Sequence, residues 1–325
     1  MFEGYTDDVG LIPGYRQDDY RNLATCGGGI VLTNAKPLDG QIAVVAGATR
    51  GAGRAIAAML GAAGATVYAT GRSVRGNPSD IGRPETIEET AALVTEQGGR
   101  GIAARVDHTV PEEVQALFAR VAEEQDGRLD ILINDVWGGE SLTEWGTPFW
   151  EGSLDKALLM QRRAVHSHLI TSYYGAPLMV RRGSGLIVEI TDGFDYRYRG
   201  NLPYSLAKTS VIHLAEAQAA ELRPHGVAAV VVTPGFLRSE EMLDHFGVTE
   251  ANWRDAGAQE AHFLQSETPF FVGRGIAALA ADPDLMAKTG RIFTSWGLSD
   301  DYGIEDVDGR RPHWGRYAEE QGFYK

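Results

Sequence analysis

A tyrosine and a lysine stand four residues apart, at Tyr204 and Lys208, in a stretch with helical spacing. Residues four apart on a helix lie on the same side, so the phenol and the ammonium would be neighbours. Such a pair is a candidate for proton transfer. Twelve residues before Tyr204 stands Asp192, preceded by Thr191, where a neutral hydrogen-bond donor would be expected. These four residues form the candidate catalytic set.

A second candidate for chemistry is the glycine-rich stretch "VVAGATRGAGRAIA", Val44 to Ala57, between a predicted strand and a predicted helix. Its glycines have the spacing G-x-x-x-G-x-G. Glycine permits a tight turn and a close approach to a pyrophosphate, and the helix N-terminus then points its amides at the phosphates. The stretch predicts a dinucleotide site, with contacts at Gly47, Thr49, Arg50, Gly51, Ala52 and Gly53.

The end of the second predicted strand indicates which dinucleotide is preferred. A carboxylate there would bind a ribose 2′-hydroxyl and repel a 2′-phosphate. The chain instead has Gly71 followed by Arg72, with Arg50 in the first loop and Arg75 nearby. Guanidinium groups without a carboxylate suit a 2′-phosphate. This pattern favours NADP(H) over NAD(H), unless these arginines are ordinary solvated loop charges.

Alternating apolar strands and helices would position these residues. We expect strands at 41–48, 66–71, 101–107, 129–135, 185–191, 227–235 and 290–295. We expect helices at 53–64, 84–99, 111–125, 154–180, 203–226 and 273–281. Apolar strands without alternation indicate a parallel sheet covered on both faces. The predicted fold is α/β, a doubly wound parallel sheet of the Rossmann type.

The same pattern predicts one main domain. We expect it over residues 38–299, between an N-terminal extension (1–37) and a C-terminal tail (300–325). Residues 236–271 interrupt the alternation with a charged, aromatic, mostly helical segment, which we interpret as a substrate lid.

Composition excludes several classes of protein. The formal net charge of −14 argues against a nucleic-acid partner or an anionic membrane surface. Cys26 is the single cysteine, so no internal disulfide can form, and a reducing cytoplasmic location is expected. The N-terminus lacks the basic start of a secretory signal, and no apolar run is long enough to span a bilayer. The histidines show no metal-ligand spacing, so we expect no metal.

Several motifs occur together in one order along the chain. They are the glycine loop, "VD" at Val106–Asp107, "LIND" at Leu132–Asp135, the Tyr204/Lys208 pair and "TPG" at Thr233–Gly235. In this order the chain resembles the short-chain dehydrogenases/reductases (SDRs) over about residues 38–297. Stretches such as "ELRPHGV" and the tail "YGIEDVDGR" are similar to the dehydrogenase/reductase SDR family member 1 group within that family.

The resemblance implies a role for each matching residue. Tyr204 would be the catalytic acid/base, and Lys208 would lower the tyrosine pKa and bond the nicotinamide ribose. Asp107 would contact the adenine, and Ser239 could bond the carboxamide. Further cofactor contacts would come from His108, Asn134, Pro234, Gly235 and Leu237. The substrate pocket would include Trp137, Phe194, Tyr198, Phe236 and Met242.

The chain departs from the family pattern at several positions. Ala46 replaces a threonine of the first strand, and Trp137 stands where a glycine normally leaves room. Ala164 falls at the place of a structural asparagine that normally helps to hold a water beside the lysine, so the proton relay would differ. Asp192 stands in the place of the catalytic serine.

Three interpretations of Asp192 remain open. Burial could keep its carboxyl protonated, so that it donates as a serine would. It could be ionised and bind a positively charged or hydroxyl-bearing substrate, such as an amine, an iminium or a polyol. In the third interpretation Thr191 supplies the donor and Asp192 caps the strand end.

We therefore expect an NADP(H)-dependent oxidoreductase that transfers a hydride between nicotinamide and a carbonyl or alcohol, or an imine or amine. The alternatives are an NADP(H)-binding regulatory or scaffold protein without redox turnover, and a lyase or isomerase on the same fold. The resemblance also implies a small-molecule substrate and assembly as a homodimer or homotetramer, paired through the helix carrying Tyr204 and the helix before it.

Overall fold

The computed structural model describes residues 36–323, so the predicted extension (1–37) lies almost wholly outside the described residues. Within that range the chain forms a seven-stranded sheet of order β3-β2-β1-β4-β5-β6-β7, parallel at every pairing. The strands are β1 (Ile42–Ala46), β2 (Thr66–Gly71), β3 (Arg100–Arg105), β4 (Ile131–Asn134), β5 (Gly185–Ile190), β6 (Val227–Thr233) and β7 (Ile292–Thr294). The predicted doubly wound α/β fold is confirmed.

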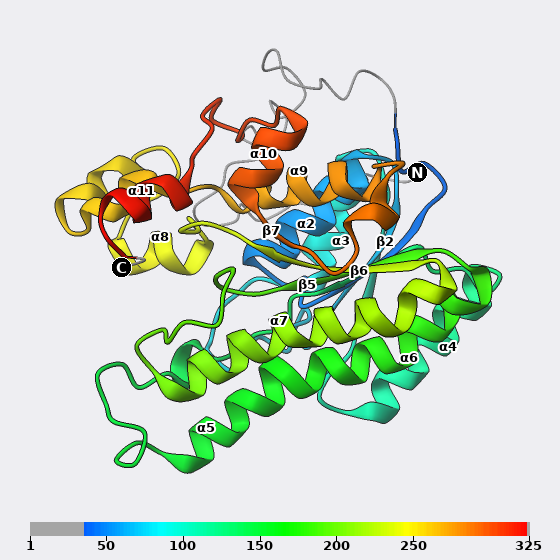
Figure 1. The fold of residues 1–325 in the computed structure, drawn as a ribbon, viewed down its shortest axis with the longest axis horizontal. Helices are drawn as coiled ribbons and strands as arrows, with labels where there is room; N and C mark the ends of the chain where they lie inside the picture. Colours follow the sequence, from blue (N-terminus) through cyan, green and yellow to red (C-terminus); the bar gives the residue numbers. More distant parts are fainter. Residues whose placement is uncertain (1–35, 324–325) are drawn as a thin grey trace, which may run out of the picture.

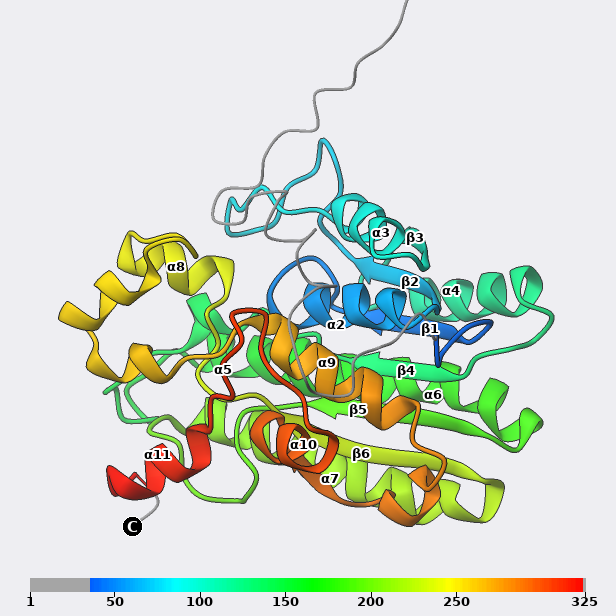
Figure 2. The same ribbon diagram turned by 90° about the horizontal axis from the view of Figure 1, so that it is seen from above.

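Helices cover both faces of the sheet (Figure 1). One face carries α2 (Gly51–Ala62), α3 (Ile87–Glu96), α9 (Pro269–Ala280) and α10 (Ser295–Tyr302). The opposite face carries α4 (Pro111–Glu124), α5 (Leu154–Gln161), α6 (Ser167–Arg182) and α7 (Leu202–Leu222). Figure 2 shows the two remaining helices at one end of the sheet: α8 (Glu240–Phe246) and α11 (Trp314–Glu320).

Burial of apolar strands explains this layering. Every residue of β1, β4 and β6 is buried, as a sheet with helices on both faces requires. The strand order reverses between β1 and β4, whose last residues, Ala46 and Asn134, are register partners. In open α/β sheets ligands bind beyond the carboxyl ends of the strands at such a reversal. The fold therefore places a binding crevice beside the glycine loop.

Two stretches differ from the elements expected from the sequence. The helix expected at 154–180 contains a π-helical turn at Arg162–His166, which separates α5 from α6. An apolar pattern with a 3.6-residue period does not mark the extra residue that such a turn accommodates. The polar, aromatic tail, for which we predicted no element, contains the last three residues of α10 and all of α11.

The segment predicted as a lid is tied to the tail through one arginine. Arg238 is fully buried, and its guanidinium lies 3.0 Å from Glu250 and 3.2 Å from Asp308. It also stacks over the ring of Trp253, with its central carbon 4.1 Å from the ring centroid. Asp306, also from the tail, accepts hydrogen bonds from the backbone and the hydroxyl of Thr268. The tail therefore holds residues 236–271 against the body.

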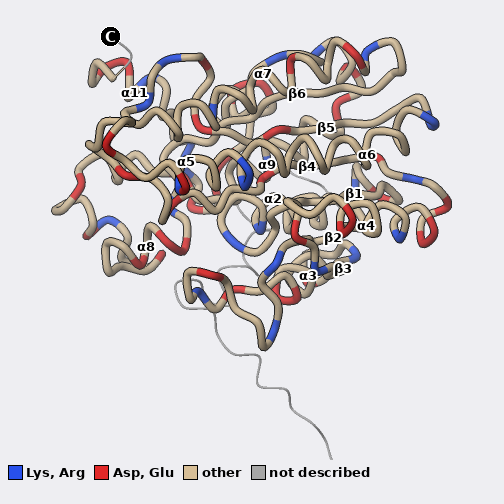
Figure 3. Tube along the Cα trace, turned by 90° about the horizontal axis from the view of Figure 1, so that it is seen from below, with Lys and Arg blue, Asp and Glu red and all other residues tan. Residues whose placement is uncertain are grey.

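Charges of both signs are interspersed along the chain rather than segregated (Figure 3). Among residues 36–323 no helix combines the length and the apolar character needed to cross a membrane. The same range contains no group of three or more His, Cys, Asp or Glu side chains placed to hold a metal ion.

Candidate active site

A large cleft lies over the carboxyl ends of the central strands. Its cavity measures about 930 Å³, and loops after β1, β2, β4, β5 and β6 line it together with aromatic residues of the tail. Most residues predicted for catalysis, cofactor and substrate lie on this one cleft: Gly47, Thr49, Arg50, Gly51, Ala52, Arg72, Asp107, His108, Trp137, Thr191, Asp192, Phe194, Tyr198, Tyr204, Lys208, Pro234, Gly235, Phe236, Leu237 and Met242.

Tyr204 and Lys208 lie one turn apart near the start of α7. Asn201 caps this helix by accepting a hydrogen bond of 3.1 Å from the backbone amide of Tyr204, which fixes where the tyrosine enters the cleft. The Tyr204 hydroxyl donates a hydrogen bond of 2.8 Å to Oδ2 of Asp192. Burial raises the pKa of Tyr204, and the Asp192 charge raises it further. The phenol is therefore held protonated in this arrangement.

Asp192 is a half-exposed carboxylate with two partners. Its side chain keeps 49% of its accessible surface, and Oδ2 lies 3.6 Å from the guanidinium of Arg199. A side chain this exposed gives little support to protonation by burial. Thr191 is buried, and its hydroxyl donates to the backbone carbonyl of Lys208 over 2.8 Å. The Thr191 hydroxyl, which the sequence offered as the alternative donor to substrate, is therefore already hydrogen-bonded within the protein.

The Lys208 ammonium lies against an aromatic ring. Its Nζ is 3.8 Å from the centroid of the Trp137 indole and 5.5 Å from that of Tyr204. The Tyr204 ring itself lies between two indoles, with centroids 5.4 Å from Trp137 and 5.1 Å from Trp145. Burial lowers the pKa of Lys208, opposed by the nearby negative charges. Sequence reasoning missed Trp145, because nothing in the local pattern places the loop before α5 on the tyrosine.

A small cavity of about 30 Å³ lies behind Lys208 and is lined by Asp135, Ala164 and His168. Burial raises the pKa of Asp135 to about 7, although the charges of Lys208 and His168 oppose this. His168 faces two acceptors, Glu189 at 2.7 Å from Nδ1 and the Val136 carbonyl at 3.0 Å from Nε2. His168 therefore links the end of β5 to the loop after β4, behind Lys208.

Two residues predicted to contact the cofactor do not line the cleft. Asn134 is fully buried and donates to Glu189 and Ser172, so it ties β4 to β5 and α6. A Cβ at Gly53 would lie 2.3 Å from the Gly47 carbonyl oxygen, so this glycine serves close packing inside the loop. His108 does line the cleft, but its two ring nitrogens bond the hydroxyls of Thr70 and Thr171, and burial lowers its pKa to about 3. The His108 ring is therefore neutral.

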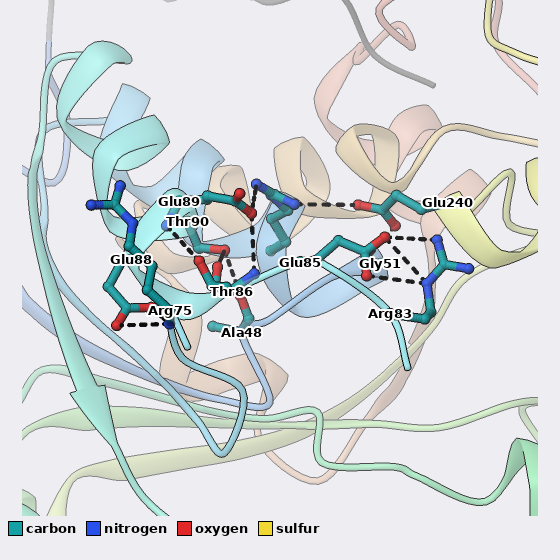
Figure 4. Close-up of polar contacts among 11 residues, drawn as sticks. Ala48, Gly51, Arg75, Arg83, Glu85, Thr86, Glu88, Glu89, Thr90 and Glu240 are labelled. Atoms are coloured by element: carbon teal, nitrogen blue, oxygen red, sulfur yellow. Dashed lines mark hydrogen bonds and ion pairs between the residues drawn. The ribbon is translucent and has the colours of Figure 1, made fainter. Parts of the chain in front are cut away.

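The glycine loop is joined to α8 by a carboxylate that the sequence did not indicate. The Gly51 amide, at the start of α2, donates to Oε2 of Glu240 over 2.9 Å. Figure 4 shows Glu240, from α8, reaching this helix end. The buried Arg54 lies 3.9 Å from Glu240 and 3.4 Å from Glu89, so it partly offsets both charges. Its contacts connect α2, α3 and α8 beside the glycine loop.

The region predicted to bind a 2′-phosphate also contains an acid. Arg72 lies 2.9 Å from Asp80 and 3.9 Å from Asp107. Asp80 pairs with Arg163 as well, over 2.9 Å. A 2′-phosphate would compete with Asp80 for Arg72, whereas a ribose 2′-hydroxyl could donate to Asp80. The segment between β2 and α3 therefore places the Asp80 carboxylate beside Arg72, although no acidic residue stands at the end of β2 itself.

Comparisons with known proteins identify the family to which the chain belongs. The family model described as short chain dehydrogenase matches residues 41–247. Human dehydrogenase/reductase SDR family member 1 is 36% identical over 279 residues, covering 85% of this chain and 86% of that protein. The mouse protein of the same name is 36% identical over 278 residues, covering 84% of this chain and 85% of its own. A short chain dehydrogenase structure from Mycobacterium thermoresistibile aligns with a TM-score of 0.70 at 24% identity, covering 86% of this chain and 92% of its own. The chain therefore belongs to the short-chain dehydrogenase/reductase family, close to the family member 1 proteins.

Proposed function

We propose that this protein is an NADP(H)-dependent oxidoreductase that uses Tyr204 and Lys208 for proton transfer. The observation that carries the proposal is the pair on one face of α7, lining the same cleft as the glycine loop. The glycine loop packs tightly on the end of β4, since a Cβ at Gly47 would lie 2.5 Å from the Asp135 carbonyl oxygen, and this supports the tight turn that a dinucleotide site needs. When bound, the nicotinamide would supply a hydride to a carbonyl carbon, or accept one from an alcohol carbon.

The chain's own groups would manage the accompanying proton. In reduction, Tyr204 gives its proton to the oxygen that becomes the product hydroxyl; in oxidation, it takes the proton back. Lys208 holds a positive charge beside the phenol, which favours the phenolate formed when the proton leaves. The residues that would hold the cofactor are those of the glycine loop with Arg72, Asp107, Pro234, Gly235 and Leu237.

For Asp192 we propose the ionised interpretation. Its exposure and its contact with Arg199 suit a charged carboxylate, and the Thr191 hydroxyl is already used. A carboxylate cannot donate to a substrate oxygen that gains negative charge, but it can accept from a substrate that carries its own donor. Substrates with a hydroxyl or a protonated nitrogen, including polyols, amines and iminium ions, therefore fit better than plain ketones.

We further propose that NADP(H) is preferred over NAD(H). Arg50 and Arg72 line the cleft where the 2′-phosphate would lie. Asp80 and Asp107 also lie near Arg72, but Asp80 is paired with Arg163 as well and its side chain is 54% exposed, so its repulsion of a phosphate is screened.

We also propose a homodimer or homotetramer, paired through α6 and α7. Large apolar side chains are exposed along these helices and the neighbouring α5: Leu154, Leu158, Leu169, Tyr173 and Leu206. Several exposed large apolar side chains on neighbouring helices support an association face there. A cytoplasmic location, the absence of nucleic-acid or membrane partners, and the division into extension, main domain, lid and tail remain part of the proposal.

Consumption of NADPH against a panel of ketones, quinones, hydroxyketones and iminium ions tests the function. Tyr204→Phe should lower turnover by about 10²- to 10⁴-fold and leave NADPH binding, followed by its fluorescence, within about twofold. Tyr196→Phe is the matched control, since Tyr196 is exposed and its hydroxyl bonds Glu216. Unchanged turnover in Tyr204→Phe would refute the assignment. Tight NADPH binding with no consumption by the wild type would instead favour the regulatory, scaffold or lyase/isomerase alternatives.

A further inference from the structure

The Lys208 side chain is partly buried, and no carboxylate lies against its ammonium. In the described part of the chain, no acidic oxygen forms an ion pair with Nζ within 4.0 Å, and the aromatic ring nearest to Nζ is the Trp137 indole, whose centroid lies 3.8 Å away. Trp137 and Lys208 line both the main cleft and the 30 Å³ cavity behind it, so together they form part of the wall between the two spaces.

The side chains of two neighbours of Lys208 are too small and apolar to stabilise its ammonium, whereas the Trp137 indole can do so. Ala164 and Ala207 are buried beside the lysine and offer no polar atom. A cation over the face of a tryptophan is attracted by the ring quadrupole, most strongly where water is excluded. The edge of the same indole contacts the Tyr204 ring, with an interplanar angle of 88°. One side chain therefore contacts both members of the proton-transfer pair.

We propose that Trp137 is a positioning residue that holds the Lys208 ammonium, in its charged form, beside Tyr204. This inference rests on the proposed function of the pair. The indole takes the place of a polar partner for the lysine, so it stabilises the ammonium and fixes its direction without competing for the protons that Lys208 would donate to a ribose.

Other charges also act on Lys208 and have to be considered in any pH dependence. They come from the ends of β4 and β5, from the loop after β4 and from the loop between β5 and α7: Asp135, Asp192, Glu140 and Arg199. His168, from α6, lines the small cavity with Lys208 and acts on Asp135. Burial lowers the pKa of Lys208, and Asp192, Glu140 and Asp135 raise it. Removal of the indole leaves all of these groups in place, so a shift in Trp137 variants reports on the ring.

The test compares Trp137→Phe, which keeps a weaker ring face, with Trp137→Leu, which keeps apolar bulk only. With the lysine ε-carbons labelled for NMR and Lys208 assigned through Lys208→Met, the wild-type ε-CH₂ signal should show an upfield ring-current shift. This shift should shrink in Trp137→Phe and vanish in Trp137→Leu. The Lys208 titration should fall by about half to one and a half pH units in Trp137→Leu, and the alkaline limb of kcat/KM should fall with it, a loss of about 3- to 30-fold at fixed alkaline pH.

Trp145→Leu is the matched control, because its indole contacts Tyr204 but is not among the rings under Lys208. The Trp145→Leu variant should change KM, while the pH at which Lys208 titrates should stay the same as in the wild type. A Lys208 signal and titration unchanged in Trp137→Leu would overturn the inference, even where Tyr204→Phe abolishes turnover. Failure of Tyr204→Phe to reduce turnover, with the Lys208 shift intact, would overturn the proposed function and leave the contact standing.

Discussion

The Tyr204 hydroxyl and Oδ2 of Asp192 lie 2.8 Å apart, and the phenol donates. A phenol that donates to a carboxylate gives up its proton less readily, because the phenolate would face a negative charge. The same phenol must exchange its proton with substrate in the proposed reaction. Asp192 therefore both opposes ionisation of Tyr204 and offers an acceptor to any substrate that displaces the phenol from it.

Replacement of Asp192 by serine should change substrate preference and pH dependence together. Asp192→Ser should raise kcat/KM for neutral ketones relative to hydroxylated or cationic substrates by about tenfold, because a neutral donor replaces the charge. Since Asp192 raises the pKa of Tyr204, its loss should move the acidic limb of alcohol oxidation to lower pH. Steady-state kinetics over a pH series measures both effects.

Asp195→Ser is the control, as its carboxylate pairs with Arg197 and Arg199. The same substrate ranking and pH profile in Asp192→Ser would contradict the ionised interpretation.

Because Arg72 pairs with Asp80, replacing Arg72 and replacing Asp80 should shift the preference between NADPH and NADH in opposite directions. Arg72→Ala should lower kcat/KM for NADPH by about 10- to 100-fold and leave NADH nearly unchanged, since a charge-assisted contact to the 2′-phosphate is lost. Asp80→Ala should raise the NADPH/NADH ratio, because a competing carboxylate is removed from the arginine. Kinetics with both cofactors measures the ratio. A selective loss of NADPH activity in Asp80→Ala, or of NADH activity in Arg72→Ala, would contradict the proposed preference.

Glu267 should make stability depend on pH near neutrality. It is 1% exposed beneath the Pro234–Gly235 turn, and burial raises its pKa to about 8. A carboxyl whose pKa is raised on folding stabilises the protein fully below the unfolded value of 4.5, and this contribution is lost as pH rises towards 8. Glu267→Gln should therefore be more stable than wild type at pH 9 by about 2 to 4 kcal/mol, and similar to it at pH 5. Denaturant unfolding at the two pH values checks this, and an equal difference at both would contradict it.

The contact between Arg238 and the tail should contribute measurable stability. Asp308→Asn should lower the free energy of unfolding by about 1 to 3 kcal/mol, because it removes a charged partner from a fully buried guanidinium. Asp300→Asn is the control; its carboxylate is 61% exposed and 3.6 Å from His313, so the loss should stay below about 1 kcal/mol. Equal losses in the two variants would show that the tail does not hold the lid through this pair.

The sheet and the glycine loop could be predicted because their signals are local. Apolar runs bounded by glycine, and a glycine spacing fixed by the needs of a tight turn, stand within a few residues of one another. Glu240 and Asp80 could not be predicted in the same way. Glu240 meets Gly51 across 189 residues, and Asp80 returns to Arg72 through an irregular segment whose path no periodicity records. The choice among the interpretations of Asp192 likewise depended on exposure and partners, which sequence does not supply.

The ion pairs of Arg238 also have a consequence for the order in which contacts can form while the chain is being synthesised. Arg238 is synthesised 70 residues before Asp308, its partner in the tail. Domains generally fold in the order of synthesis, and Glu250, 12 residues after Arg238, is made well before the tail. Until Asp308 is made, Arg238 can pair with Glu250 but not with its partner in the tail. The aromatic wall formed by Trp296, Trp314 and Phe323 is added in the same late step.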